Sequence, residues 1–446
     1  MYSQEIESLL KSKKIKIGDK VLVTKGKLEH VGILMPRIEM GDVSSLVIKL
    51  SNGYNIGIKH DRDINVRRLE TAWRLSQKKE PDVKKLVFDK ALPTISIIGT
   101  GGTIASKIDY RSGGVYASFS AEDIANQIPQ LKTVANIKTE QIMEIMSEDM
   151  SPEIWIEIAH KVAKEIESGS DGIVITHGTD TLHYTAAALS FMLRDLPVPV
   201  ALVGAQRSSD RGSGDAALNV FCAANFVANS SIAEVCTVLH ADMGDNSCYA
   251  IRGTKSRKLH TSRRDAFQPV NDTPLARIDS EGRIEILNTN YRIRGDKKVK
   301  VDDKLETKVA LIKIYPGMDP SIIDYYIEKG YKGLVIEATG LGHIPTLNEK
   351  YSLLPKFEKA MHLGIPVVIT SQCIHGRVHP TIYHNLRKLF TRGVIFAEDM
   401  LSEVAYIKLM FALAKFKDMH QIKEFMLANI AGEITERTLS KDFVVK

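Results

Sequence analysis

The N-terminal part of the chain alternates between short apolar runs and polar turns. Runs rich in Val and Ile occur at "KVLVTKG", "HVGILMPR", "SLVIKLS" and "YNIGIKH", and polar or glycine-bearing turns separate them. Short β-branched runs at this spacing are typical of antiparallel strands in a small barrel. The pattern predicts a small all-β barrel over residues 1–75. The charged stretch that follows contains a proline and no glycine, and it predicts a linker over 76–92.

From residue 93 the pattern changes to apolar strands that alternate with amphipathic helices. "TISIIGT", "DGIVITHGT" and "PVPVALVGAQ" are strand-like, and "SPEIWIEIAHKVAKEIESG" has helical periodicity. Recurrent strand, helix and strand predict a parallel α/β domain over 93–290. A polar linker over 291–307 and a second α/β domain over 308–425 follow, and residues 426–446 form a C-terminal tail.

Composition adds bounds on the class of protein. No run of eighteen apolar residues occurs and the first residues are polar, so we expect a soluble, untargeted chain. Four cysteines without paired spacing favour a reducing cytoplasm and argue against a cysteine metal site. Residues 1–90 hold 19 Lys and Arg against 12 Asp and Glu, so they carry +7, whereas the whole chain carries +6. This basic module indicates either an acidic partner such as nucleic acid or solvated surface lysines.

The glycine-rich turn "SIIGTGGTIAS" ends the first strand of the α/β region. A dinucleotide turn needs a third glycine where Thr103 stands, and no phosphate-binding G-x-x-x-x-G-K-[ST] loop occurs in the chain. The sequence of this turn therefore predicts that Thr103 exposes its hydroxyl group among small neighbouring residues.

A second turn of this kind follows the strand in "GIVITHGTDTLHYTAAALS". Thr179, Asp180 and Thr181 are ordinary residues for a helix N-cap, and this is the alternative to a catalytic role. Parallel α/β sheets bind ligands at the carboxyl ends of their strands. We therefore expect two hydroxyls and a carboxylate to meet in one crevice.

The motifs "TGGTIAS" and "THGTDT" resemble the two signatures of the bacterial-type L-asparaginase and glutaminase family, over residues 93 to 420. The resemblance implies two α/β domains with the active site in the first. It implies that Thr103 is the nucleophile and that Thr179 and Asp180 assist it. In "AIRGTKSRKLH" it assigns the catalytic lysine to Lys255. A solvated charge in a basic loop is the alternative for that lysine.

The same resemblance implies the substrate-binding residues. "GGVYASF" places the tyrosine of the family's mobile lid at Tyr116, and "MSEDM" resembles the substrate clamp, with Ser147 and Glu148. Glutamate replaces the more usual glutamine at position 148, which we expect to alter amide preference. No metal site is expected.

A threonine hydroxyl needs a partner that takes its proton, because it is a weak nucleophile near neutral pH. Lys255 supplies that partner if it lies beside Asp180. Attack on a side-chain carboxamide forms an acyl-enzyme and releases ammonia, and backbone N–H groups of the turns suit the oxyanion.

The basic β-rich module and the cationic "SRKLHTSRR" segment have no counterpart in simple asparaginases. Both resemble the archaeal-type glutamyl-tRNA(Gln) amidotransferase D subunits (GatD), in which an SH3-like barrel precedes an asparaginase-like body. The resemblance implies hydrolysis of glutamine or asparagine and transfer of ammonia to a partner, GatE, that acts on Glu-tRNA(Gln) with ATP and Mg²⁺. It implies no cofactor in this chain, a cytoplasmic location, contact with tRNA(Gln) through the complex, and a homodimer.

Two alternatives remain at this point. The chain could be a free-standing L-asparaginase or glutaminase of amino-acid catabolism. It could also be a non-catalytic RNA-binding or scaffold protein, although it retains the five polar groups named for the site. The cationic module and the segment from Lys255 to Arg264 are expected to serve assembly with the partner or tRNA.

Overall fold

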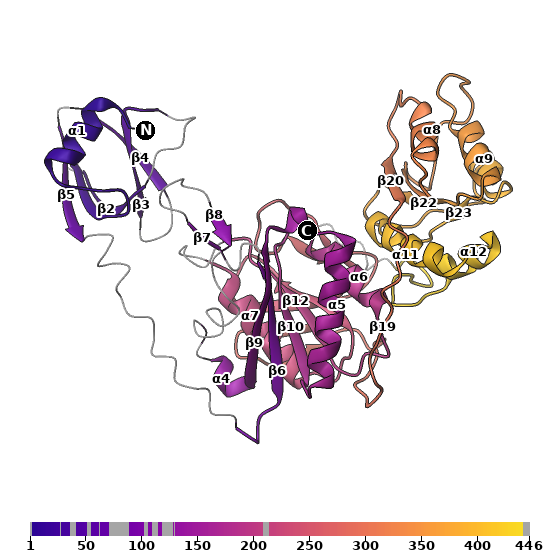
Figure 1. The fold of residues 1–446 in the computed structure, drawn as a ribbon, viewed down its shortest axis with the longest axis horizontal. Coiled ribbons are helices and arrows are strands. Elements are labelled where there is room, and N and C mark those ends of the chain that lie inside the picture. The colour runs from indigo at the N-terminus through magenta and orange to yellow at the C-terminus, as the bar shows by residue number, and fades with distance from the viewer. Residues whose placement is uncertain are drawn as a thin grey trace.

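The structure is a computed structural model of the 446-residue chain. It describes residues 2–26, 28–35, 42–50, 55–61, 63–70, 89–101, 106–108, 115–117, 128, 130–207 and 214–439. Figure 1 shows an N-terminal module followed by two α/β domains.

The N-terminal module is a five-stranded antiparallel sheet with one helix. Helix α1 spans Gln4–Ser12, and the Ser3 side chain caps it by accepting a hydrogen bond from Ile6 N. Its Ile6 packs with Val21, Val23 and Val66 in a separate small core. In the spatial order β4-β3-β2-β1-β5, the strands are β1 (Lys20–Lys25), β2 (Leu28–Leu34), β3 (Ser45–Leu50), β4 (Asn55–Lys59) and β5 (Ile64–Glu70). The predicted all-β character of this region is confirmed in its antiparallel strands, and the helix α1, which was not predicted, precedes them.

The first α/β domain is built on an eight-stranded sheet in the order β18-β17-β14-β13-β12-β10-β6-β9. The five strands from β9 to β13 in this order are parallel, as predicted, and the other three are antiparallel. Their bounds are β6 (Thr94–Gly101), β9 (Asn136–Ile145), β10 (Gly172–Thr176), β12 (Val200–Val203), β13 (Val235–His240), β14 (Ser247–Arg252), β17 (Ala276–Asp279) and β18 (Ile284–Ile286).

The buried apolar residues of β10 point alternately to the two faces of the sheet, which explains why helices cover both faces. Ile173 and Ile175 belong to one core and Val174 to another, because successive strand residues point to opposite faces. Helices α5 and α6 cover the first face and α7 the second (Figure 1). The helices of this domain are α4 (Leu131–Val134), α5 (Pro152–Glu167), α6 (Leu182–Met192) and α7 (Ala216–Asn229).

The second α/β domain has a four-stranded parallel sheet in the order β20-β21-β22-β23. The strands are β20 (Val309–Lys313), β21 (Gly333–Ala338), β22 (Val367–Ser371) and β23 (Ile395–Phe396). The helices are α8 (Ser321–Glu328), α9 (Leu354–His362), α10 (His384–Phe390), α11 (Ser402–Lys415) and α12 (Met419–Leu427).

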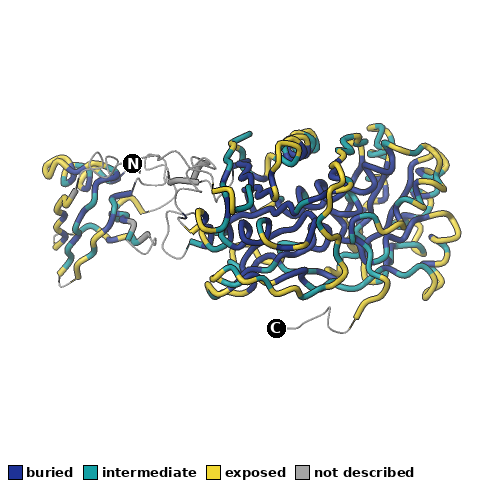
Figure 2. Tube along the Cα trace, turned by 90° about the horizontal axis from the view of Figure 1, so that it is seen from below, coloured by how far each residue is buried: buried dark blue, intermediate teal, exposed yellow. Residues whose placement is uncertain are grey.

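One hydrophobic core joins the two α/β domains. Helix α11 of the second domain packs on α6 of the first, with the Phe191 and Phe411 ring centroids 5.8 Å apart. Figure 2 shows buried chain through both domains. None of the helices within the described part of the chain is long and apolar enough to cross a membrane.

Short two-stranded sheets complete the structure. They pair β7 (Ser106–Ile108) with β8 (Val115–Ala117), β11 (Leu193–Arg194) with β19 (Lys300–Val301), and β15 (Ser256–Lys258) with β16 (Phe267–Pro269). The predicted linker over 291–307 thus contains β19, which pairs back onto the first domain.

Candidate active site

Three neighbouring strands of the first domain end at the same edge of its sheet. β6 lies between β10 and β9 and runs parallel to both, with Gly99 in register with Thr176. The Thr100 hydroxyl donates to the carbonyl oxygen of Thr176 at 2.8 Å, which ties two of these ends together. The segments after these strands lead to Thr103, Ser147 and Thr179, so the topology favours this edge as a ligand-binding site.

A lysine lies beside the predicted threonine and aspartate. Lys258 Nζ donates hydrogen bonds to Thr179 Oγ1 at 2.8 Å and to Asp180 Oδ1 at 2.7 Å. The Thr179 and Lys258 side chains are largely buried, whereas the Asp180 side chain is 68% exposed. Thr179 and Asp180 precede helix α6, whose positive N-terminal end favours nearby negative charge. The arrangement can pass a proton between a hydroxyl, an amine and a carboxylate.

The structure does not place Lys255, the lysine that the resemblance assigns to catalysis, beside Thr179 and Asp180. Lys255 Nζ instead lies 2.7 Å from Asp399 Oδ2 of the second domain, and both side chains are buried. Burial lowers the pKa of the Lys255 ammonium below its usual value, while the nearby Asp399 carboxylate opposes that effect. Lys255 therefore bridges the two domains, and Lys258, three residues later, lies beside Thr179 and Asp180.

Ser147, assigned by the resemblance to the substrate clamp, lies next to the second signature turn. It begins the short 3-10 helix Ser147–Asp149 after β9, and its hydroxyl accepts a hydrogen bond from Asp180 N at 3.3 Å. Its carbonyl oxygen accepts one from the Thr181 hydroxyl at 2.6 Å. A Cβ at Gly178 would lie 2.7 Å from Ser147 Cβ, so glycine permits this close approach. The neighbouring Glu148 is exposed.

Two predicted residues cannot be placed in this geometry. Thr103 lies outside the described residues, two positions after Gly101 at the end of β6. Tyr116 belongs to β8, but its side chain lies outside the description. Their roles stay predictions.

A buried histidine, His177, contacts the backbone of the second turn and the helix that follows it. His177 Nδ1 lies 2.7 Å from the Gly178 carbonyl oxygen, and its Nε2 lies 2.8 Å from the Thr185 hydroxyl. Trp155 donates to the same hydroxyl at 3.1 Å. Burial lowers the pKa of His177 to about 4, so the ring is neutral at pH 7. The contacts of its two nitrogens hold the ring in place.

A second buried histidine lies between the turn and the other domain. Burial, and then the charges of Arg257 and Lys258, lowers the pKa of His183 to about 3. Its Nε2 is 3.8 Å from the buried carboxylate of Glu403. Neither ring nitrogen has a hydrogen-bond partner among the described residues. The neutral ring adds no charge beside Lys258.

The cationic segment from Lys255 to Arg264 does not form an unpaired positive surface. Its cations have carboxylate partners, and two of these partners belong to the second domain. The ion pairs are Lys255 with Asp399, Arg257 with Glu403, Lys258 with Asp180, Arg263 with Asp265, and Arg264 with Asp245. The segment thus organises the domain interface and the candidate site.

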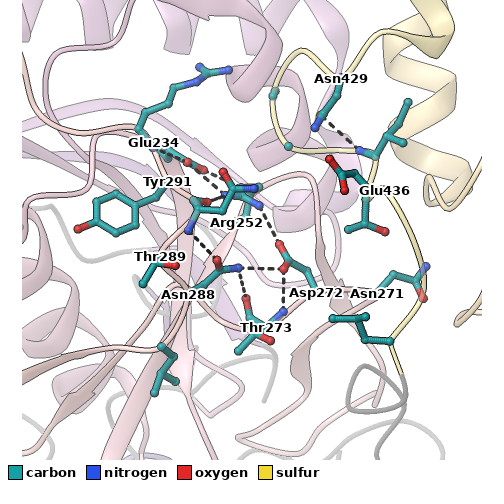
Figure 3. A pocket seen from close by; sticks show the side chains of 18 of the residues that line it. Glu234, Arg252, Asn271, Asp272, Thr273, Asn288, Thr289, Tyr291, Asn429 and Glu436 are labelled. Carbon is teal, nitrogen blue, oxygen red and sulfur yellow. Dashed lines mark hydrogen bonds and ion pairs between the residues drawn. The ribbon is translucent and has the colours of Figure 1, made fainter.

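A polar cavity of about 610 Å³ lies elsewhere, between the first domain and residues 429–439 (Figure 3). Arg252 extends between Glu234 and Asp272 in its wall, and none of the predicted site residues lines it. Within the described ranges, no three His, Cys, Asp or Glu side chains gather as a metal site.

Family models match the chain in three parts. Residues 94–292 match the N-terminal domain of asparaginase, and residues 308–426 match the glutaminase/asparaginase C-terminal domain. Residues 15–69 match the GatD N-terminal domain.

Curated relatives match along the whole chain. The glutamyl-tRNA(Gln) amidotransferase D subunit of Pyrococcus furiosus is 51% identical over 99% of this chain and 100% of its own length. The protein of the same name from Thermococcus kodakarensis is 46% identical over 99% of both chains.

Solved asparaginases match the two α/β domains. The thermostable L-asparaginase from Thermococcus kodakarensis has a TM-score of 0.68 at 33% identity, covering 77% of this chain and 99% of its own. L-asparaginase I from Vibrio cholerae has a TM-score of 0.66 at 29% identity, with the same two coverages.

Proposed function

This chain belongs to the family of glutamyl-tRNA(Gln) amidotransferase D subunits, and on that premise we propose that it releases ammonia from glutamine or asparagine for a partner subunit. The observation that carries the hydrolytic half is the contact of Lys258 with Thr179 and Asp180 at the carboxyl edge of the sheet. The full-length match and the GatD-type N-terminal region favour this function over a free-standing asparaginase.

Thr103 is the proposed nucleophile. Its hydroxyl oxygen attacks the side-chain carboxamide carbon, the C–N bond breaks, and ammonia leaves with the added proton. Water then attacks the threonyl ester, which frees the amino acid with a carboxylate side chain and restores the hydroxyl. Splitting the hydrolysis in this way replaces one difficult step by two easier ones.

Lys258 is the proposed proton carrier for these steps, in place of Lys255. Its ammonium already contacts one hydroxyl and one carboxylate, so a proton can move between them without a change of position. General acid and base help of this kind contributes about 10²- to 10⁴-fold in rate. Asp180 balances the charge of Lys258, and Thr179 links the lysine to the turn.

Thr179 supports a second assignment of the nucleophile, because its hydroxyl lies 2.8 Å from the lysine amine. The two threonines are distinguished by trapping the enzyme with a diazoketone analogue of glutamine and locating the adduct by mass spectrometry. An adduct on the peptide of Thr103 supports the first assignment, and one on that of Thr179 overturns it.

Ser147, Glu148 and Tyr116 are the proposed substrate contacts. The contact of the Ser147 hydroxyl with Asp180 N supports this role, and the exposed Glu148 carboxylate can hold the α-ammonium of an amino acid. Replacing Glu148 by Gln tests whether this position affects the choice between glutamine and asparagine.

The chain needs a partner for the synthetic half of the reaction. We propose a GatE-like subunit that activates Glu-tRNA(Gln) with ATP and Mg²⁺ and receives the ammonia, with no cofactor in this chain. The complex acts in the cytoplasm on tRNA(Gln), and the D-type chain forms a homodimer at its core.

The deciding experiment compares the isolated chain with the chain plus its partner. We expect slow ammonia release from glutamine alone and a marked increase when partner, ATP and Glu-tRNA(Gln) are added, together with Gln-tRNA(Gln). Fast hydrolysis that ignores the partner would instead identify a free-standing amidase. Thr103→Ala abolishes both activities if the mechanism holds.

A further inference from the structure

Residues 252–258, called here the run, lead from the end of β14 to Lys258. Chain segments far away in sequence hold these seven residues. The first, Arg252, lies between Glu234 and Asp272 (Figure 3). Gly432 lies against its side chain so closely that a Cβ there would be 2.4 Å from Arg252 Cδ. The Thr254 hydroxyl donates to the Ala431 carbonyl oxygen at 3.0 Å. Residues 429–436, called here the C-terminal segment, therefore cover the start of this run.

Asp399 connects the middle of the run to the same C-terminal segment. Its Oδ2 accepts hydrogen bonds from Lys255 Nζ at 2.7 Å and from the Thr435 hydroxyl at 2.6 Å. Its Oδ1 accepts one from Thr435 N at 3.0 Å. Lys255 and Asp399 are almost completely buried. One carboxylate thus joins the first domain, the second domain and the C-terminal segment.

The end of the run has two cations that serve different domains. Arg257 forms an ion pair with the buried Glu403 at the start of α11, and the next residue, Lys258, contacts Thr179 and Asp180. Adjacent residues of a strand point to opposite sides. The strand β15 therefore presents its lysine to the active site while its arginine holds the second domain.

Within the first domain, the Ser256 hydroxyl of β15 lies 2.7 Å from the Thr237 hydroxyl of β13. Among the described residues, β15 forms a sheet with β16 alone. The attachment points of the run on the second domain, Asp399 and Glu403, are four positions apart in sequence, with Asp399 before α11 and Glu403 at its start. A shift of either would move the backbone that carries Lys258, and a misplacement near 1 Å can cost about 10²-fold in rate.

We infer that Asp399 and Glu403 are positioning residues for Lys258, and that through them the second domain and the C-terminal segment set the amidase rate. The inference rests on the proposed role of Lys258. Within the described part of the chain, neither carboxylate forms a hydrogen bond or ion pair with Thr179, Asp180 or Lys258. Their effect is on the placement of the lysine and therefore on kcat more than on KM.

The test uses the full-length chain together with its partner. Two variants are compared, and each removes a different ion pair between the run and the second domain. Glu403→Gln keeps the shape of the side chain and removes the charge that holds Arg257. The double change Lys255→Met with Asp399→Leu replaces the buried ion pair by apolar side chains, because removing one partner alone would strand a buried charge and threaten folding. Asp324→Asn is the control, since Asp324 pairs with Lys356 and Lys359 within the second domain and lies outside the run.

Two measurements are made on each variant. The first is kcat and KM for ammonia release. The second is the rate at which Lys258 is acetylated by a small anhydride, followed by mass spectrometry, which reports the surroundings of the lysine without using activity. We expect both positioning variants to lower kcat about 10- to 100-fold with KM little changed, and to alter the acetylation rate of Lys258. Asp324→Asn changes neither quantity.

Glu403→Asp is the conservative variant, and it should recover part of the lost kcat because it restores the charge. An unchanged kcat in both folded positioning variants would overturn the inference, and so would a fall in kcat with unchanged acetylation of Lys258. The proposed function fails by a different result, namely near-normal ammonia release by a folded Lys258→Met protein.

Discussion

The ammonium group of Lys258 lies 2.7 Å from the carboxylate of Asp180, at the carboxyl edge of the first sheet. Lys255, only three residues earlier, points to Asp399 of the other domain. Two lysines of one short basic segment thus have separate tasks. One faces the candidate active site, and the other holds the domain that lies behind it.

We expect Lys258→Met to lower kcat for ammonia release by about 10²- to 10⁴-fold, because the change removes the proton carrier. The matched control is Lys161→Met. Lys161 on α5 is as buried as Lys258 and also pairs with carboxylates, but it lies away from the three strand ends. Initial rates with glutamine and asparagine, together with thermal melts, give the comparison. A folded Lys258→Met protein with ordinary kcat would refute the assignment.

We expect Lys258, Asp180 and Thr179 to act as one unit. Asp180→Asn and Thr179→Val should each reduce kcat strongly, but either should add little once Lys258→Met is present. The reason is that a proton network loses most of its effect when one member is removed. Double-mutant cycles measured on kcat provide the check, and losses that multiply fully would mean that the three residues work independently.

We expect Gly101→Ala to destabilise the protein and disturb the first turn. Gly101 has φ +106°, and a Cβ would lie 2.4 Å from the Ile145 carbonyl oxygen of β9. Gly169→Ala is the control, since Gly169 also has a positive φ but has nothing within 4 Å of the added Cβ. Urea denaturation should show about 1 kcal/mol for the control, from the backbone alone, and about 1–3 kcal/mol more for Gly101→Ala, from overpacking. Equal losses in both variants would remove the steric argument.

We expect the free energy of unfolding to fall as the pH drops below 6.5. Burial lowers the pKa of His177 to about 4 and that of His183 to about 3. Between pH 4 and 6.5 the unfolded chain binds protons at these rings that the folded chain does not, so acid favours unfolding. From pH 6.5 to 5 the two rings together account for about 3 kcal/mol.

The measurement is urea denaturation at several pH values. His183→Gln removes one titrating ring, so the variant should lose about half of this contribution relative to the unchanged protein. An identical pH dependence in the two proteins would show that His183 does not remain neutral on folding.

We expect a chain that starts at residue 89 to fold and to retain ammonia release. The N-terminal module has its own core, and among the described residues no hydrogen bond or ion pair joins it to the two α/β domains. Residues 1–90, which include this module and the segment after it, carry +7, and this charge suits an acidic partner. Formation of Gln-tRNA(Gln) with the partner should therefore drop, and in the full-length chain partner or tRNA binding should weaken as salt screens the charges.

Unchanged affinity and unchanged coupled activity in the shortened chain would remove any role for the module in assembly. Loss of folding would instead show that the module stabilises the body. Thermal melts on the same samples separate these results.

Local sequence patterns were enough to predict the parts of the fold that depend on residues close together in the chain. Glycine turns after apolar runs predicted the strand ends that precede Thr103 and Thr179, and alternating strands and helices predicted two α/β domains. Parallel strands bring their carboxyl ends together, so Ser147 and Asp180 could be expected near one another, and they are in contact. These features follow from backbone geometry and periodicity.

The choice between Lys255 and Lys258 depended on contacts that no local pattern contains. Asp399 and Glu403, which hold the segment, lie 144 and 146 positions beyond the residues they pair with, Lys255 and Arg257. The same long-range pairs neutralise Lys255 and Arg257, two cations of the segment that was expected to serve assembly with the partner or tRNA. A charged side chain meets a partner from a distant part of the chain only when the protein has folded. Because an unpaired buried charge is costly, the buried Lys255 must face a carboxylate, which Asp399 of the other domain supplies.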